Sequence, residues 1–75
     1  MSDLQKASSI GPKMVSWLNK AGILTLSDVR RFEADGGTLD DLAFLMEMEN
    51  DGLRMDGNGR KALRNLMVYA REMQG

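Results

Sequence analysis

Apolar residues recur at three- and four-residue spacing along most of the chain, which is the pattern of helices that bury one face. No stretch of useful length alternates apolar and polar residues as a half-buried strand does. The sequence therefore predicts an all-α fold, a compact bundle of four to five short helices in a single domain over residues 1–75. The first two predicted helices span residues 2–8 and about 12–21. The third is capped by Thr25 or Ser27 and ends before the sequence ADGG. The fourth begins at Thr38, and a long fifth helix runs from Gly59 nearly to the C-terminus.

Local signals mark where these helices begin and end. Pro12 suits a first helical position, and Gly22 suits the left-handed position that follows a helix. Thr38 is followed three residues later by Asp41, an acidic form of the capping box. The residues expected on the inner faces are Met14, Val15, Trp17, Leu18, Val29, Phe32, Leu39, Leu42, Leu45, Met46, Leu63, Leu66, Met67, Ala70 and Met73.

Composition limits the chain to one small domain. With 75 residues, 43% of them apolar and 28% charged, it is expected to be globular rather than disordered. It has no Cys and no His, so helix packing or a partner must stabilise the core in place of disulfides or a Cys/His metal site. No apolar run approaches about 18 residues, and the opening sequence MSDLQKASSI lacks the apolar core of a signal peptide. We therefore expect a cytoplasmic protein with no membrane partner.

The formal net charge of −1 hides a strong separation of charge along the chain. Residues 32–56 hold eight acids against one base, which gives −7. The rest of the chain holds nine bases against three acids, which gives +6. Opposite charge on different segments suits binding through charged surfaces, either to a nucleic acid or to a protein.

Two similar segments each combine a glycine turn with the basic start of a helix, SIGPKMVSWL and GNGRKALRNL. Glycine allows a tight turn at a helix start, where unpaired N–H groups lie at the positive end of the helix dipole. Lys13 follows Gly11 closely, and Arg60 and Lys61 follow Gly59. A phosphate can bind at such a place. The alternative is that the glycines are ordinary turn residues and the bases a solvated helix face.

These two segments resemble the helix-hairpin-helix superfamily. The stretch IGPKMVSWLNKAGILTLSDVRR is similar to the C-terminal domains of TfoX competence regulators and of the bacterial RNA polymerase alpha subunit, and GNGRKALRNL is similar to the second motif of the alpha-subunit domain. The resemblance implies two packed helical hairpins that contact nucleic-acid backbone in a transcription-related regulatory role. Lys13 stands where the alpha-subunit family has an Arg that contacts DNA, so bidentate recognition would be weaker.

Helical geometry groups the basic residues. At about 100° per residue, Arg60, Arg64 and Arg71 fall within roughly 40° of one another, and Lys13 and Lys20 lie seven residues apart on one edge. If the two hairpins lie side by side, these edges form one positive surface. The candidate nucleic-acid-binding residues are Gly11, Lys13, Lys20, Gly59, Arg60, Lys61, Arg64 and Arg71.

The chain also resembles sterile alpha motif domains, which are five-helix modules of about this length. The shared features are Val15, Trp17 and Leu18 near the start and GNGRKALRNL before a long last helix. This resemblance implies a protein–protein interaction module, such as a small phage-like regulatory or inhibitor protein, and the opposite charges would suit head-to-tail self-association. The candidate partner-binding residues for this alternative are Glu47, Glu49, Asp51 and Asp56.

The sequence offers little for catalysis. Without His or Cys, an enzyme would need a carboxylate pair or an activated Ser or Lys in a pocket, for which a bundle of this size has little room. The segment DGLRMDGNG is similar to part of a calcium loop, but Leu53 or Arg60 would occupy ligand positions. We therefore expect no enzyme activity, no metal and no cofactor.

Overall fold

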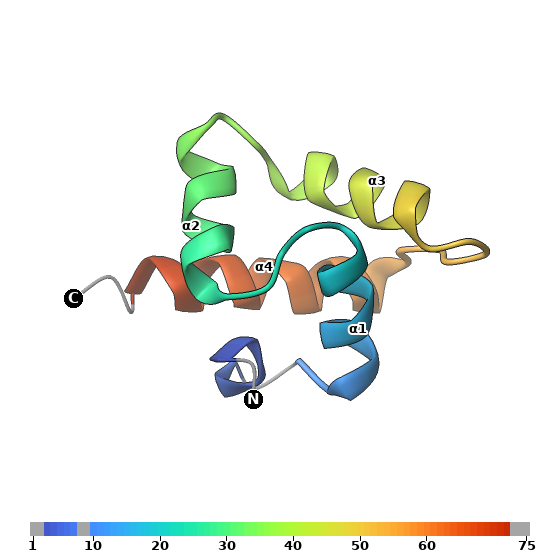
Figure 1. The fold of residues 1–75 in the computed structure, drawn as a ribbon, viewed down its shortest axis with the longest axis horizontal. Coiled ribbons are helices and arrows are strands. Elements are labelled where there is room, and N and C mark those ends of the chain that lie inside the picture. The colour runs from blue at the N-terminus through green and yellow to red at the C-terminus, as the bar shows by residue number, and fades with distance from the viewer. Residues whose placement is uncertain (1–2, 8–9, 73–75) are drawn as a thin grey trace.

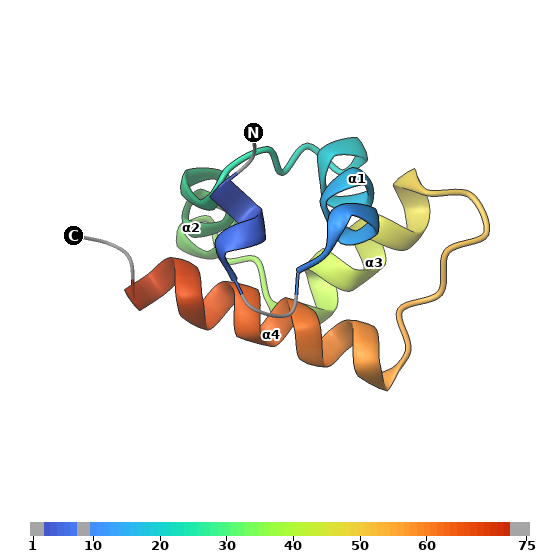
Figure 2. The same ribbon diagram turned by 90° about the horizontal axis from the view of Figure 1, so that it is seen from below.

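The computed structural model describes residues 3–7 and 10–72, and all the regular structure within these ranges is helical (Figure 1). The all-α prediction is therefore confirmed. The longest helix, α4, runs along the length of the molecule, and Figure 2 shows it on one side with η1, α1 and α2 opposite. The elements are the 3₁₀ turn η1 (Asp3–Lys6) and the helices α1 (Pro12–Lys20), α2 (Leu26–Ala34), α3 (Leu39–Glu49) and α4 (Gly57–Glu72).

Reciprocal capping boxes start the two middle helices. The side-chain oxygen of Thr25 accepts a hydrogen bond from the N–H of Asp28, whose carboxylate accepts from the N–H of Thr25 at 3.1 Å. Thr38 and Asp41 exchange the same two bonds at 3.2 and 3.0 Å. Of the two caps considered for α2, Thr25 is therefore the one that the chain uses. Each box satisfies two backbone groups that a helix start leaves without intrahelical partners.

The other helix limits also follow local chemistry. Pro12 is the first residue of α1, as predicted, and Gly22 follows this helix with a φ of 89°, where a side chain would be strained. The predicted first helix over residues 2–8 is a single 3₁₀ turn in the part that the structure describes. The last helix begins at Gly57, two residues before the predicted start.

The core receives side chains from every element. Most predicted inner residues are buried, and Trp17 and Phe32 pack against this core while remaining partly exposed. Leu45 is only half-buried, because the inner stripe of α3 runs through Leu42, Ala43 and Met46 and Leu45 points away from it. The predicted inner position of Met73 lies outside the described residues. The fully buried large side chains are Leu4, Leu18, Val29, Leu42, Met46, Leu63 and Leu66.

A buried asparagine joins α1 to the end of α3. Asn50 is 4% exposed, and its Nδ2 donates to the carbonyl oxygens of Trp17 and Met46, each at 3.0 Å. Its Oδ1 is buried and has no hydrogen-bond partner among the described residues. The helices pack as α4 against α2 and α3, and as α1 against α3 and η1. Asn50 therefore lies where α1 meets the end of α3.

Across the described ranges, none of the helices combines the length and the apolar character that a membrane crossing needs.

Candidate interaction surfaces

The first glycine hairpin has an open helix start. Gly11 precedes α1 in an extended conformation, no described side chain caps this helix, and a Cβ atom at Gly11 would meet no described atom within 4 Å. Lys13 and Lys20 are exposed, and neither forms an ion pair with any described residue. The start of α1 therefore combines uncapped backbone N–H groups with an unneutralised lysine.

The second glycine hairpin differs from the first because a carboxylate already lies at its helix start. The Oδ1 atom of Asp56 accepts a hydrogen bond from the N–H of Gly59 at 2.9 Å. The backbone carbonyl of the same residue accepts from Arg60 at 2.9 Å. A phosphate arriving here would displace a carboxylate or be repelled by it. The two hairpins are similar in sequence but not in their capacity to hold an anion.

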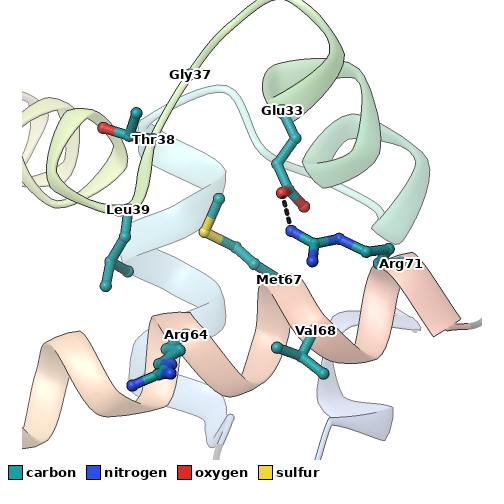
Figure 3. Close-up of a pocket in the computed structure, with 8 residues that line it drawn as sticks. All are labelled: Glu33, Gly37, Thr38, Leu39, Arg64, Met67, Val68 and Arg71. Atoms are coloured by element: carbon teal, nitrogen blue, oxygen red, sulfur yellow. Dashed lines mark hydrogen bonds and ion pairs between the residues drawn. The ribbon is translucent and has the colours of Figure 1, made fainter.

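Ion pairs neutralise part of the basic stripe on α4. Arg60 pairs with Asp40 at the start of α3, and Arg71 pairs with Glu33 of α2 at 2.6 Å (Figure 3). Arg64 and Lys61 are exposed and have no ion pair in the ranges that the structure describes. Two of the four candidate cations on α4 therefore hold the helix to its neighbours.

The structure does not link the lysines of α1 to the arginines of α4. The paired arginines reach α3 and α2, whereas α1 packs against α3 and η1. In Figure 2, α1 and α4 lie on different sides of the molecule. No hydrogen bond or ion pair between described residues joins Lys13 or Lys20 to the basic residues of α4. The described contacts therefore do not join the two basic edges into one surface.

The four candidate acids divide into two structural and two exposed residues. Glu47 is half-buried and accepts a hydrogen bond from the N–H of Met55 at 2.8 Å, and Asp56 binds the start of α4 as described above. Glu49 and Asp51 are exposed and have no ion pair within the described ranges. Only these last two are free to meet a partner without disturbing the fold.

Sequence reasoning missed a pair of exposed apolar residues on α3. Phe44 is 63% exposed and Met48 is 64% exposed, and they lie one turn apart on the same face. A signal for them exists, because α3 carries apolar residues on every side and cannot bury all of them. With Asp40 one turn earlier, they form what we call the α3 stripe: Asp40, Phe44 and Met48.

A matching stripe of opposite charge lies on α4. Arg60, Arg64 and Val68 also follow one another at four-residue spacing, and we call them the α4 stripe. Val68 is 43% exposed, so this stripe too has an apolar end. The first members of the two stripes, Asp40 and Arg60, form the ion pair already described.

A shallow hollow of about 490 Å³ lies where the turn between α2 and α3 passes over α4 (Figure 3). Its floor includes Leu39 and Met67, and its charged groups are Arg64 and the Glu33–Arg71 ion pair. The carboxylate of Glu33 is held by Arg71. In the residues that are described, no three acidic side chains gather as a metal site would require. The residues that line it are Glu33, Gly37, Thr38, Leu39, Arg64, Met67, Val68 and Arg71.

Comparison with protein-family models finds no family that matches this chain. Neither the curated proteins nor the solved structures give a significant match. Function is therefore inferred from the geometry of the surfaces described above.

Proposed function

We propose that the protein is a non-enzymatic protein-interaction module that binds a partner through the exposed face of α3. The observation that carries this proposal is the adjacent exposure of Phe44 and Met48 on one helix face. Exposed large apolar side chains that lie together are typical of interaction sites. Burying each of them would contribute about 1.5–3 kcal/mol before the costs of association are subtracted.

The surrounding charge defines the chemistry of the partner. Asp41 and Glu49 are exposed near the two apolar residues, and Asp51 follows at the end of the helix. A partner that carries lysine or arginine beside apolar side chains, such as a basic amphipathic helix, fits this surface. The proposal includes a sterile-alpha-motif-like arrangement of two helical hairpins, which is supported by the long final helix that packs against α2 and α3.

A basic amphipathic peptide made of leucine and lysine is a suitable probe of this surface. Titrated into ¹⁵N-labelled protein, it should shift the amide signals of α3 around Phe44 and Met48. Phe44→Lys should weaken the peptide at least about tenfold, because it replaces apolar contact with charge repulsion. Leu24 lies outside α3 and is 56% exposed, an exposure comparable to that of Phe44. Leu24→Lys should therefore leave binding unchanged. Absence of α3 shifts at millimolar peptide would contradict the proposal.

A second candidate function is binding of nucleic-acid backbone at the start of α1, in a regulatory role. The observation that favours it is the start of α1 beside Lys13, which no described side chain caps, with Lys20 on the same helix; neither lysine has an ion-pair partner among residues 3–7 and 10–72. Two lysines neutralise about two phosphates, so the log–log salt slope should be about −2. Affinity of a single domain would lie in the nonspecific range of about 10⁻⁴ to 10⁻⁶ M.

Titration of the labelled protein with short duplex DNA in 50 mM and 200 mM salt tests this second function. Amide shifts should concentrate at Gly11 and Lys13, and Lys13→Glu should remove most of the binding. Lys61→Glu is the matched control on α4 and should have a much smaller effect. Equal losses from the two variants would argue against a specific role for the first hairpin, and a lack of shifts at 50 mM salt would exclude the function.

A further inference from the structure

We propose that the partner of the α3 face is a second copy of this chain, whose α4 stripe docks against the α3 stripe of the first. This inference rests on the proposed protein-interaction function and identifies the partner. Both stripes combine charge with exposed apolar side chains, and they are complementary. The α3 stripe has Phe44 and Met48 beside the exposed acid Asp41, and the α4 stripe has Val68 beside Arg64 and the nearby Lys61.

The charges beside the stripes have no ion-pair partner in the described ranges, and the exposed carboxylate of Asp41 bonds only the start of its own helix there. Asp40 and Arg60 neutralise each other within one chain. Arg64 and Lys61 remain unpaired on α4 among the described residues, and Asp41 forms no ion pair there on α3. Each stripe therefore has net charge of one sign beside an apolar surface. This charge favours binding of the α3 stripe to an α4 stripe and disfavours binding between two stripes of the same kind.

The two stripes adjoin each other on the same molecule. The Asp40–Arg60 ion pair joins their first residues. The hollow beneath the α2–α3 turn is lined by Leu39 from the first turn of α3 together with Arg64 and Val68 from α4 (Figure 3). The two stripes therefore meet at this ion pair, with acidic charge along one and basic charge along the other.

Such a pair of stripes is complementary to itself under a two-fold rotation. When two copies face each other, the α3 stripe of each lies against the α4 stripe of the other, so both contacts form at once. The assembly closes as a dimer and leaves neither stripe free to extend a chain of copies. Because few residues take part, the interface belongs to the small, transient class.

Sedimentation velocity of the whole chain from 10 µM to 1 mM, in 50 mM and 500 mM NaCl, measures this association. We expect a monomer–dimer equilibrium at low salt that weakens severalfold at high salt, because exposed charges are screened. Phe44→Lys and Arg64→Glu should each be monomeric alone. An equimolar mixture of the two should form a dimer again, since the introduced lysine faces the introduced glutamate while the other contact stays native.

Leu24→Lys serves as the control for added charge at an exposed leucine and should dimerise like the unmodified chain. Circular dichroism confirms that every variant is folded. A chain that stays monomeric at 1 mM and low salt, or a mixture of the two charge variants that stays monomeric, overturns the proposal. If the basic peptide still shifts the α3 signals in that case, the α3 face binds a different basic protein and the interaction function stands without self-association.

Discussion

Replacing Leu63 by alanine should lower the free energy of unfolding by about 2–5 kcal/mol. The side chain is fully buried in the helix that packs against both α2 and α3, so the substitution leaves a cavity at the centre of the bundle. At about 0.05–0.15 kcal/mol per residue, a chain of 75 residues has a total stability of about 4–11 kcal/mol. The variant should therefore be marginally folded at room temperature.

Urea denaturation followed by circular dichroism measures this loss. Val68→Ala removes apolar volume from an exposed position of the same helix and should change the free energy of unfolding by no more than about 0.5 kcal/mol. A loss below about 1 kcal/mol for Leu63→Ala would show that α4 does not form the centre of the core.

Asn50→Asp should destabilise the protein about as much as Leu63→Ala does. We expect the free energy of unfolding to fall by about 3–5 kcal/mol at neutral pH. The native amide donates to the carbonyl oxygens of Trp17 and Met46, and a carboxylate at the same buried position would face both oxygens without a proton to donate. The cost combines the two lost hydrogen bonds with the burial of a charge.

The pH dependence of this variant distinguishes charge burial from a simple loss of packing. Burial raises the pKa of the introduced carboxyl above its unfolded value of about 3.9, so the folded state binds its proton more tightly than the unfolded state. The loss of unfolding free energy, relative to the native chain at the same pH, should therefore be smaller at about pH 3.5 than at pH 7. Asn19→Asp makes the same change at an exposed position of α1 and should cost no more than about 0.5 kcal/mol. A deficit that is equal at both pH values would contradict this account.

The helices were predictable because their signals are local. Thr25 and Thr38 each lie three residues before an aspartate, and both capping boxes form. Pro12 starts a helix and Gly22 follows one, because the conformations that these residues favour decide those positions whatever the rest of the chain does. The outer residues of α3 were harder to assign. An apolar residue on every side of a helix shows that one face must stay uncovered, but which face depends on the positions of α1 and α4.

The state of the basic residues could not be predicted in the same way. Arg60 and Arg71 are paired with acids 20 and 38 residues away in sequence, and only the packing of α2 and α3 on α4 brings these groups together. Asp56 is different, because its bond to Gly59 spans three residues and is an ordinary local turn. A carboxylate three residues before the second glycine was therefore a readable sign that the two hairpins are not equivalent.

The hydrogen bond from Asn50 to Trp17 gives the protein a natural optical probe. Trp17 is the single tryptophan of the chain, and it lies half-buried on α1 where that helix meets the end of α3. Its fluorescence emission will therefore follow the docking of α1, whereas the far-ultraviolet signal is dominated by the longer helices α3 and α4. Coincident transitions from the two signals would show that α1 unfolds together with the rest of the bundle. An earlier change in emission would identify the α1 contact as the first to open.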